Sequence, residues 1–502
     1  MLGLHRGMIS LGQIPSLYAD ICGGDTICLT YPDGEVTWSE LERRANRRAR
    51  MLKDYGIKSD DFVTVSLENG TLFHEICFAL WKLGATPHIV SPRLPHAELK
   101  GILELLDPVM LVTAGSLFVP GCSSMDAGLP VDGYPGSPLQ PRTAKHWKAM
   151  SSGGSTGRPK IIVDQSPSEV EPSEWLLDMP ERDCVLNPGP LYHNAPFMMA
   201  HHGLFRGNHV VGMSRFDAEE ALRLIEKFRP AWVMMVPTMM HRIWRLPVAT
   251  RDNFDLSSLK VVGHVASPMP VWLKEVWIEW LGADRIYELY GGTEGTGATW
   301  IRGDDWLAHK GSVGKFIRDA RVRVLNDRGL DCEPGEIGEV YLMPAGGPGS
   351  TYHYIGAEAK SVDGGWETLG DMGWLDKDGY LYLADRRTDL IISGGANIYP
   401  AEVEAALAEH PSVDSAVAIG IPDDDLGQIV HAIVHIHKYW QEEVGESELR
   451  NFLLERLAQY KTPRTYEFVE YSLRDDAGKV RRSEFRERRI EELQTGGGPE
   501  VV

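Results

Sequence analysis

The stretch from 151 to 160 reads S-S-G-G-S-T-G-R-P-K and gathers glycines, hydroxyl side chains and a lysine within ten residues. Glycines let the backbone approach a phosphate closely, and Ser155 and Thr156 offer hydroxyl donors. Lys160 adds a positive charge that can follow a phosphate as it moves. Most Gly/Ser-rich runs are solvated loops, so the stretch alone leaves phosphate binding and a plain loop equally open.

Six further motifs, two of them made of two polar stretches each, could carry chemistry. Two follow expected strands, P-L-Y-H-N at 190–194 and Y-G-G-T-E-G at 290–295. The others are G-S-V-G-K at 311–315 with P-G-E-I-G-E at 334–339, T-L-G-D-M-G at 368–373, D-R-R-T-D at 385–389 with S-G-G-A-N at 393–397, and G-K-V-R-R at 478–482. Taken singly, Glu294 or Asp371 would be a solvated turn acid, and Lys479 would belong to a basic surface run.

The elements that position these stretches alternate between strands and helices. Thr37 and Glu40 form the pattern of a capping box, which predicts a helix up to about Gly56. Expected strands at 61–67, 88–90 and 109–113 are separated by an amphipathic helix at 72–83 and a helix at 96–106. This rhythm predicts a parallel α/β sheet, and the Gly/Pro-rich segment 115–145 predicts a surface connection into the glycine loop.

A second α/β run follows the glycine loop. We expect a strand at 161–163, a helix that begins within 166–180, and further alternation up to a strand at 285–289. Past Gly303, short strands with turn signals predict a β-rich subdomain. From about 386, a helix opened by Pro400, two strands and a helix at 446–460 predict an α+β tail domain. The predicted class is α/β: a large N-terminal body of two similar α/β subdomains plus a β-rich subdomain, then a small C-terminal domain.

Composition excludes several classes of protein. The chain has 502 residues, with 71 Asp+Glu against 51 Lys+Arg and a formal charge of -20, so its surface repels nucleic acid and anionic membranes. No window approaches the ~20 apolar residues of a membrane span, and the N-terminus lacks the apolar core of a signal peptide. Six scattered cysteines indicate reduced thiols rather than a disulfide framework. We therefore expect a cytoplasmic protein with no nucleic-acid partner.

Clustered histidines offer a metal-site hypothesis that we reject at this point. His431, His435 and His437 alternate along an expected strand, but no cysteine or acid stands at a suitable spacing. We interpret them as a solvent-facing strand, and we interpret His201 and His202 as structural in the same way.

Together and in order, the seven motifs resemble those of the adenylate-forming superfamily, which includes acyl-CoA synthetases, peptide-synthetase adenylation domains and luciferases. The resemblance covers nearly the whole chain and is strongest for the acyl-CoA ligase branch, near ligases that act on steroid or other polycyclic acids. It implies an N-terminal ATP- and acyl-binding domain over 1–386 and a mobile C-terminal domain over 387–502, with a hinge near Thr388.

The resemblance also implies a role for each matching residue. In that family a carboxylate attacks the α-phosphate of ATP, pyrophosphate leaves, and coenzyme A then takes the acyl group. The β- and γ-phosphates would be held by Ser152, Ser155, Thr156, Gly157 and Lys160. Glu294 with Thr156 would hold Mg²⁺, and Thr293 would contact the α-phosphate. Lys479 would bridge the attacking carboxylate and the α-phosphate.

Nucleoside and thiol contacts are implied in the same way. Asp371 would accept both ribose hydroxyls, with Arg386 beside it, while the adenine site would be formed by Tyr290, Gly291 and Ala266. Gly394 and Gly395 would let the pantetheine arm of coenzyme A approach closely. His193 has two open interpretations, a gate of the acyl pocket or a structural histidine.

The acyl pocket should be walled by 193–203, 236–241, 263–268 and 291–299. These segments supply Phe197, Met198, Met199 and Val236 together with many small residues, which suits a bulky hydrophobic acid. Amino-acid-activating relatives keep an Asp near 193–197, and this chain has none there. The substrate is therefore expected to be a small-molecule carboxylic acid without an amine.

Three departures from the family pattern stand out. Thr388 replaces the usual Asp or Lys at the hinge, and Ile161 replaces a glycine after Pro-Lys. Asp475 and Asp476 stand near Lys479 where neutral hydroxyls are commoner, and their charge is expected to weaken the adenylation step.

Rival functions remain. A stand-alone adenylating enzyme would pass the acyl-adenylate to a carrier protein or partner enzyme, and a nucleotide-binding scaffold would not turn over. A P-loop kinase is excluded, because Arg158 and Pro159 stand between Gly157 and Lys160. A homodimer stays open as the assembly.

Overall fold

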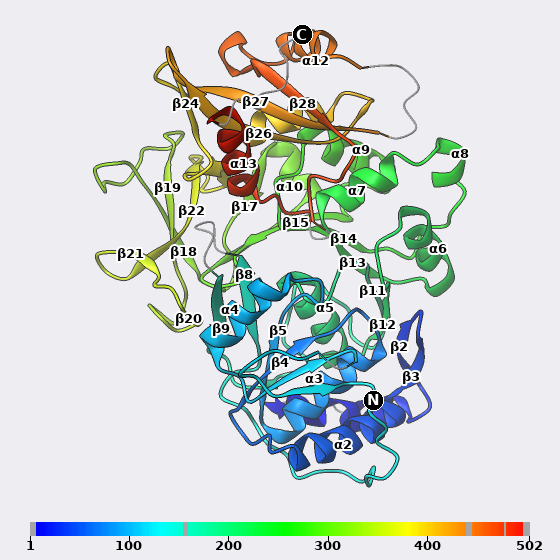
Figure 1. The fold of residues 1–502 in the computed structure, drawn as a ribbon. Coiled ribbons are helices and arrows are strands. Elements are labelled where there is room, and N and C mark those ends of the chain that lie inside the picture. The colour runs from blue at the N-terminus through cyan, green and yellow to red at the C-terminus, as the bar shows by residue number, and fades with distance from the viewer. Residues whose placement is uncertain (1–6, 116, 154–158, 438–443, 476–477, 495–502) are drawn as a thin grey trace.

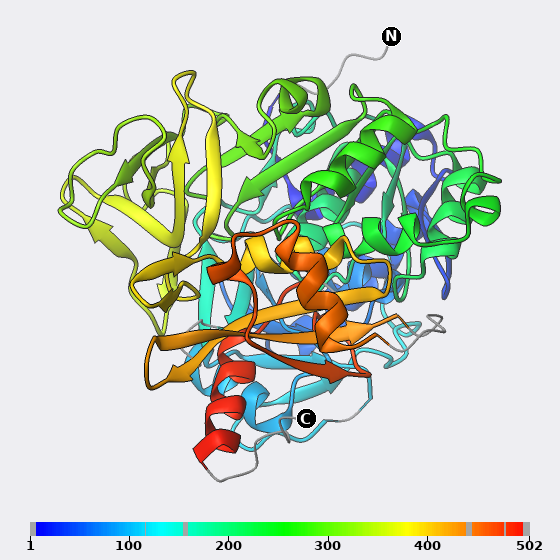
Figure 2. The same cartoon turned by 90° about the horizontal axis from the view of Figure 1, so that it is seen from above.

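The computed structural model describes residues 7–115, 117–153, 159–437, 444–475 and 478–494, without the side chains of 152 and 153. A large body holds the N-terminal three quarters of the chain, and the C-terminal elements lie across one end of it (Figure 1). Seen from above, the orange and red C-terminal elements cover the middle of the body, with the antiparallel sheet that contains β22 (Trp366–Leu375) to one side (Figure 2).

The first α/β unit is a seven-stranded sheet. Its spatial order is β20 (Tyr352–Ile355), β9 (Pro159–Asp164), β8 (Ala149–Gly153), β5 (Thr86–Ile89), β4 (Phe62–Ser66), β6 (Met110–Thr113), β7 (Ser124–Asp126). The neighbouring strands from β8 to β7 are parallel. At the other side of β8, β9 pairs with it antiparallel, and β20 pairs antiparallel with β9 as the edge strand. The glycine loop thus joins β8 to β9 at the end of this sheet.

The second unit is an eight-stranded sheet. Its spatial order is β16 (Ala298–Arg302), β15 (Ile286–Gly291), β14 (Val261–His264), β13 (Trp232–Met235), β11 (Cys184–Asn187), β12 (His209–Gly212), β2 (Ile27–Tyr31), β3 (Gly34–Thr37). The strands from β15 to β2 run parallel, so the loops after β14 and β15 leave the same edge of the sheet. Ligands of open α/β sheets bind at that kind of edge.

Helices cover both sheets. They are α1 (Ile14–Cys22), α2 (Trp38–Asp54), α3 (Thr71–Leu83), α4 (His96–Leu106), α5 (Asn194–Phe205), α6 (Ala218–Phe228), α7 (Pro237–Trp244), α8 (Val248–Arg251), α9 (Val271–Leu281) and α10 (Gly303–Ala308). Thr37 caps α2 as predicted, because its hydroxyl accepts the Glu40 N–H at 3.3 Å. The Glu40 carboxylate pairs with Arg44 instead of reaching back to complete the predicted box.

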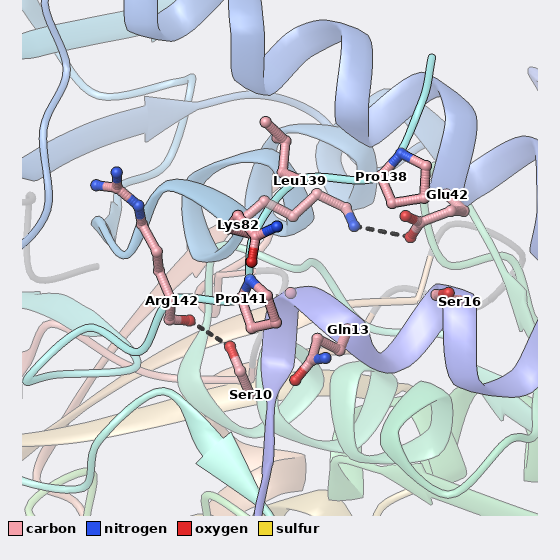
Figure 3. Close-up of a pocket in the computed structure, with 11 residues that line it drawn as sticks. Ser10, Gln13, Ser16, Glu42, Lys82, Pro138, Leu139, Pro141 and Arg142 are labelled. Atoms are coloured by element: carbon pink, nitrogen blue, oxygen red, sulfur yellow. Dashed lines mark hydrogen bonds and ion pairs between the residues drawn. The ribbon is translucent and has the colours of Figure 1, made fainter.

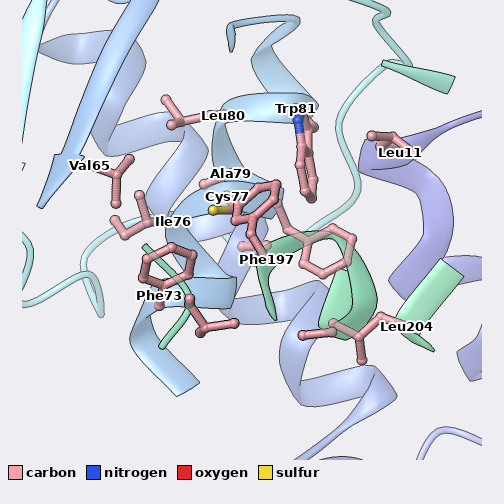
Figure 4. Close-up of a cluster of buried hydrophobic side chains, with 14 of the residues drawn as sticks. Leu11, Val65, Phe73, Ile76, Cys77, Ala79, Leu80, Trp81, Phe197 and Leu204 are labelled. Atoms are coloured by element: carbon pink, nitrogen blue, oxygen red, sulfur yellow. The ribbon is translucent and has the colours of Figure 1, made fainter. Parts of the chain in front are cut away.

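The main core surrounds α3. Every residue of this helix except Leu72 is buried, and Phe73, Trp81 and Phe197 pack together there (Figure 4). The helix expected at 72–83 is thus present as α3, but its expected amphipathic character was wrong. A helix that is covered on all sides has no solvent face, so its apolar residues need not be confined to one stripe.

An antiparallel sheet and the C-terminal elements complete the fold. The sheet has the order β17 (Ser312–Gly314), β23 (Leu381–Arg386), β22 (Trp366–Leu375), β19 (Gly338–Met343), β18 (Arg321–Leu325), with β21 (Lys360–Val362) on β22. The C-terminal elements are β24 (Ile391–Ser393), β25 (Ala396–Ile398), α11 (Pro400–Ala408), β26 (Val413–Asp423), β27 (Gly427–Ile436), α12 (Glu446–Leu454), β28 (Thr465–Val469) and α13 (Arg482–Gln494). The predicted α/β class with a small α+β tail agrees with this architecture.

Several local predictions were wrong. No helix begins within 166–180; a two-residue strand β10 (Glu169–Val170) pairs there with β1 (Ile9–Ser10), and turns follow. The prolines of that segment lack the N–H that a helix requires. The helix expected at 446–460 ends at Leu454, and α7, α10 and α13 lacked a prediction because each is short or polar.

The histidine interpretation needs one correction. His431 is 0% exposed, and its Nδ1 lies 2.7 Å from the Thr465 hydroxyl, so it does not face solvent. His435 lies 3.1 Å from Asp414, an acid that sequence spacing did not reveal. Among the described residues, the groups that could hold a metal ion are His309, Asp376 and Asp378, and the strand histidines are not among them.

Candidate active site

A continuous cleft of about 2560 Å³ lies between the body and the C-terminal elements. Ten of the predicted site residues line it, namely Lys160, His193, Ala266, Tyr290, Gly291, Thr293, Glu294, Asp371, Arg386 and Lys479. Residues from both sheets, the antiparallel sheet and the C-terminal loop therefore meet in one place. Such a meeting is what a reaction with two substrates and a nucleotide requires.

Glu294 is one of the buried acids that line the cleft. Its Oε1 accepts a hydrogen bond from the Tyr354 hydroxyl at 2.6 Å and lies 3.2 Å from Lys160 Nζ. Burial raises the pKa of the carboxyl, but Lys160 and Tyr354 outweigh burial and leave the pKa below its ordinary value. Glu294 is thus ionised at neutral pH and has the oxygen chemistry that Mg²⁺ prefers.

Lys160 stands on β9 and Tyr354 on the adjacent edge strand β20. The Lys160 ammonium lies 4.1 Å from the centre of the Tyr354 ring and 2.8 Å from its hydroxyl. Sequence reasoning missed Tyr354, because T-Y-H-Y-I-G carries no motif. Only the pairing of β20 with β9, with Tyr354 opposite Ile162, brings its hydroxyl to Glu294.

The glycine loop is described only at its two ends. At the first end, Ser151 Oγ lies 2.8 Å from His88 Nε2, and His88 Nδ1 lies 3.0 Å from the Thr64 hydroxyl. Burial lowers the pKa of His88 to about 3, so this histidine is neutral. Ser155, Thr156 and Gly157 lie outside the described residues, as does the Ser152 side chain, so their phosphate and metal roles stay predictions.

Three predicted nucleoside residues form a connected group. The Tyr290 hydroxyl donates to Asp371 Oδ2 at 2.7 Å, and Arg386 Nε lies 3.4 Å from Asp371 Oδ1. The register of β22 with β23 places Asp371 opposite Arg386. Ala266 follows β14 with a φ of 81°, an unusual conformation for a residue with a side chain, and such strain is typical of ligand-binding loops.

Lys479 reaches the cleft on a tight turn of the C-terminal segment. Asp475 Oδ1 accepts the Lys479 N–H at 2.8 Å, and the Asp475 N–H donates to the Lys479 carbonyl at 2.9 Å. The side chain faces the open cleft, yet surrounding protein from both domains lowers the pKa of its ammonium. Arg386 lowers this pKa further, whereas Asp475 and Glu294 raise it.

The acyl-pocket segments contribute to the same cleft. Its lining includes residues from all four predicted segments, among them Met198, Met199 and Val236. Phe197 is a correction: it is 0% exposed and packs in the core with Trp147 and His201, because the α5 turn points its ring away from the cleft. His193 stands at the N-cap of α5 and lines the cleft, which leaves its predicted gating role untested.

Comparison with known families then decides the class. The AMP-binding enzyme family matches residues 22–354, and the AMP-binding enzyme C-terminal domain matches residues 402–479. This chain belongs to the AMP-binding enzyme family. The predicted adenylate-forming superfamily is thereby confirmed. The exact boundary at 386/387 and the hinge at Thr388 fall between the two matches and stay predictions.

Relatives of this AMP-binding enzyme are CoA ligases. The 2-succinylbenzoate–CoA ligase of Bacillus licheniformis is 30% identical over 475 residues, which cover 91% of this chain and 96% of the relative. Long-chain-fatty-acid–CoA ligase FadD13 of Mycobacterium tuberculosis is 30% identical over 477 residues, which cover 91% of this chain and 93% of the relative. The predicted acyl-CoA ligase branch and the ligase class are confirmed.

Solved structures of one relative confirm the fold. The o-succinylbenzoate CoA synthetase of Bacillus subtilis with its acyl-adenylate intermediate matches with a TM-score of 0.81 at 26% identity, over 96% of this chain and 98% of that chain. The same enzyme with ATP and a magnesium ion also gives 0.81, at 27% identity over 95% and 99%. These complexes and the names of the relatives agree with the predicted cofactors ATP, Mg²⁺ and coenzyme A.

A second complex of the Bacillus subtilis enzyme matches this AMP-binding enzyme less well than the acyl-adenylate complex does. A double variant of the Bacillus subtilis enzyme bound to a CoA product analogue gives a TM-score of only 0.67, at 26% identity over 96% of this chain and 99% of that chain. In this chain, Gly394 and Gly395, in the turn between β24 and β25, do not line the cleft that holds Lys479. The predicted thiol-binding role of these glycines has no support from the present arrangement.

A second, small cavity of about 80 Å³ lies far from these residues, between the N-terminal segment and 138–142 (Figure 3). Its one buried ammonium, Lys82, pairs with Glu42 at 2.7 Å. Among the described residues this cavity holds no group that the predicted chemistry needs.

Within the described ranges, every helix falls short of the length and apolar character that a bilayer crossing requires. The six cysteines are all free. The cytoplasmic location and the homodimer stay predictions.

Proposed function

We propose that this protein is an AMP-forming acyl-CoA ligase that activates a bulky hydrophobic, polycyclic carboxylic acid. The observation that carries the proposal is the meeting of Lys479, from the C-terminal segment, with Glu294, Lys160 and Asp371 in one cleft. Joining two anions requires positive charge, which Lys479 and Lys160 supply from two parts of the chain, while Glu294 and Asp371 offer oxygen atoms to a metal ion and to ribose hydroxyls.

The first half-reaction brings the acid and ATP together. An oxygen of the carboxylate attacks the α-phosphorus, an acyl–phosphate bond forms, and the bond to the β-phosphate breaks to release pyrophosphate. Two anions in contact repel each other by roughly 4 kcal/mol at an intermediate dielectric. The Lys479 ammonium offsets that repulsion, and Asp475 and Glu294 help to keep it charged.

The leaving pyrophosphate and the nucleoside are held by separate groups. Lys160 sits where β9 leaves the glycine loop and neutralises phosphate charge. Asp371, fixed by the Tyr290 hydroxyl at 2.7 Å, keeps its second oxygen beside Arg386 for the ribose. Mg²⁺, when bound, would be held by Glu294 and supplies charge neutralisation at the phosphates.

The second half-reaction transfers the acyl group to coenzyme A. The thiol sulfur attacks the acyl carbon, the bond to the phosphate oxygen of the adenylate breaks, AMP leaves and the thiol proton is released. We infer that the C-terminal domain, from about residue 387, moves away from the cleft for this step, since Gly394 and Gly395 lie outside it in the present arrangement. The CoA-ligase names of the relatives support the choice of coenzyme A as acceptor.

The acid is inferred from the walls of the cleft. Met198, Met199 and Val236 are apolar, and the glycines from Gly291 to Gly297 leave room beside them. The described part of the 193–197 segment carries no acid that would bind an amine. These features support a bulky hydrophobic acid over an amino acid.

The test is an acid panel with ATP and Mg²⁺, covering aromatic, fatty and polycyclic acids, with and without coenzyme A. We expect pyrophosphate release that depends on a polycyclic acid, and an acyl-CoA product identified by its mass. Pyrophosphate release with no thioester would indicate a carrier protein or partner enzyme as acceptor. AMP or ATP binding with no pyrophosphate release from any acid would indicate a scaffold and contradict the proposal.

A further inference from the structure

The acyl-pocket walls are apolar, but the cleft also has a polar region around Lys148 and Asp164, which we call its polar end. Lys148 and Asp164 both line the cleft there, and Lys148 Nζ lies 3.2 Å from Asp164 Oδ2. The Lys148 side chain is only 1% exposed, so it reaches the cavity without reaching open solvent. An ammonium buried this deeply is uncommon in a pocket for a purely apolar ligand.

Two elements run from the reaction centre to this polar end. On β9, Lys160 and Asp164 are four residues apart and face the same side, which spans about 13 Å. On α5, nine residues separate His193 from His202, which spans about 14 Å. His202 packs against Trp147 with ring centres 5.6 Å apart, next to Lys148 in the chain. Asp164 is therefore about 13 Å from Lys160 along β9.

Two threonine hydroxyl groups that line the cleft have no hydrogen-bond partner among the described residues. Thr296 is 1% exposed, and its Oγ1 has no hydrogen bond to any described residue. Thr351 Oγ1 likewise has no hydrogen bond to any described residue. Thr351 precedes Tyr352, and Tyr352 lies opposite Asp164 in the pairing of β20 with β9. Buried polar atoms in proteins almost always have partners, and an exception in a ligand cavity indicates a group that a ligand satisfies.

The pair of Lys148 and Asp164 has a structural interpretation, because Asp164 also accepts the Ser166 N–H at 2.9 Å. A buried ion pair by itself gives little net stability, however, since desolvation offsets the attraction. Among the described residues, Lys148 makes one ion pair, to Asp164, and its ammonium lies 5.1 Å from the Trp147 ring centre, so this set of contacts leaves donors for a ligand. The unpartnered threonine hydroxyls in the same cavity favour a ligand-binding role.

We propose that Lys148, Asp164 and Thr296 bind a neutral oxygen substituent, a hydroxyl or a ketone, at the end of the acid farthest from its carboxylate. This inference rests on the proposed function and deepens it. The lysine and aspartate charges compensate each other, so a second carboxylate would leave a net buried negative charge. A ketone accepts from Lys148 or Thr296, and a hydroxyl can also donate to Asp164.

The experiment compares two matched acids. One is a polycyclic monocarboxylic acid with a single ketone at the distal end of its rings, and the other is the same acid without the ketone. The readout is the ratio of their kcat/KM values in acid-dependent pyrophosphate release. For the unchanged enzyme we expect the keto acid to be preferred roughly tenfold, the value of about one buried hydrogen bond.

The decisive variant is the double substitution Lys148→Met with Asp164→Asn. It removes both charges together, so no uncompensated charge is buried, and Asn keeps an acceptor for the Ser166 N–H. We expect the ratio to fall toward one, mainly through a higher KM for the keto acid. If the kcat/KM values of both acids fall and their ratio is unchanged, the pair of Lys148 and Asp164 has only a structural role, and the inference is overturned.

Thr296→Val provides a nearly isosteric second test if the double variant does not fold. It should lower the ratio several-fold and leave the melting temperature unchanged or higher, because it removes an unpartnered hydroxyl. A lower melting temperature with an unchanged ratio would overturn the role of Thr296.

Two outcomes with the unchanged enzyme would refute the binding role of the polar end while leaving acid activation intact: a ratio of one, or a preference for an acid with a distal carboxylate. Absence of pyrophosphate release with every acid would instead refute the proposed function.

Discussion

Glu294 and Lys479 show how charges in the cleft set one another's state. Lys160 at 3.2 Å and the Tyr354 hydroxyl at 2.6 Å keep Glu294 ionised against the effect of burial. For Lys479 the shift favours the uncharged form, because burial and the charge of Arg386 lower the pKa of its ammonium. The carboxylate charge of Asp475 raises the pKa of Lys479 and so opposes this lowering, whereas the predicted weakening of the adenylation step stays a prediction.

Lys479→Met should cripple adenylation. Without the ammonium, the repulsion between carboxylate and α-phosphate is not offset, and a loss of about 10²–10³ in kcat is expected from removing one such group. The measurement is pyrophosphate exchange, with nucleotide binding followed in parallel. Nucleotide binding should be nearly unchanged, because Tyr290 and Asp371 remain.

Thioester formation from a supplied acyl-adenylate serves as the control for Lys479→Met. It should proceed at close to the rate of the unchanged enzyme. Unchanged pyrophosphate exchange would remove Lys479 from the mechanism.

Asp475→Asn tests the charge balance through pH. The adenylation rate should decline as pH rises through the lowered pKa of Lys479, because the ammonium loses its proton. Asn keeps an acceptor for the Lys479 N–H but removes the carboxylate charge that raises this pKa. The pKa then falls further, so the alkaline decline should move to lower pH in a profile of kcat for pyrophosphate exchange.

A shift of that decline to higher pH, or no shift, would contradict the assignment of Asp475 as the supporting charge. Asp475→Ala is the comparison variant, since it removes both the charge and the hydrogen bond of the turn.

At the scale of elements, strand ends and caps position the chemistry. The loops after β14 and β15 leave the same edge of a parallel sheet, which brings Ala266 next to the segment from Tyr290 to Glu294. The motifs predicted these loops correctly because glycine and short polar residues mark them. The burial of α3 on all sides had no such local signal.

Thr37→Ala tests the helix cap that the sequence predicted. Loss of the hydroxyl that accepts the Glu40 N–H should destabilise the first turn of α2 by about 1 kcal/mol. Hydrogen exchange of the amides near Glu40 should accelerate roughly fivefold. Thr37→Ser keeps the acceptor and should exchange like the unchanged protein; equal exchange in both variants would refute the cap.

At the scale of the whole molecule, Arg245 joins the two domains. From the C-cap of α7 its guanidinium donates to the Pro411 carbonyl, to the His410 carbonyl at 3.1 Å and to the Ala408 carbonyl at 3.5 Å. Its Nε donates to His241 Nε2 at 3.0 Å; burial and the Arg245 charge lower the pKa of His241 to about 4, so this histidine is a neutral acceptor. The end of α11 carries partial negative charge that suits a cation.

Arg245→Met should therefore weaken the present domain arrangement. We expect pyrophosphate exchange to slow several-fold, because fewer molecules hold Lys479 in the cleft, while acyl transfer from a supplied acyl-adenylate is not slowed. The measurement is the rate of each half-reaction in single turnover.

Arg242→Met, an exposed arginine on the same helix, is the matched control and should affect neither rate. Equal slowing of both half-reactions by Arg245→Met would mean a loss of folding stability and would contradict a role in domain placement.

The sequence by itself determined the family chemistry. The glycine loop, Glu294, Asp371, Arg386 and Lys479 stand in motifs whose order is specific, and most helices and strands followed from local periodicity, caps and turn residues. These signals are local, so they can be read without knowing what lies beside them.

Only the tertiary structure decided which side chains from distant segments meet. Tyr354 reaches Glu294 through strand pairing, Arg245 reaches α11 through domain placement, and Lys148 meets Asp164 across β8 and β9. Such contacts depend on long-range packing and on the burial of charge, neither of which leaves a pattern along the chain. The polar end of the acyl cleft, and with it the proposed substituent on the acid, belongs to this second kind of information.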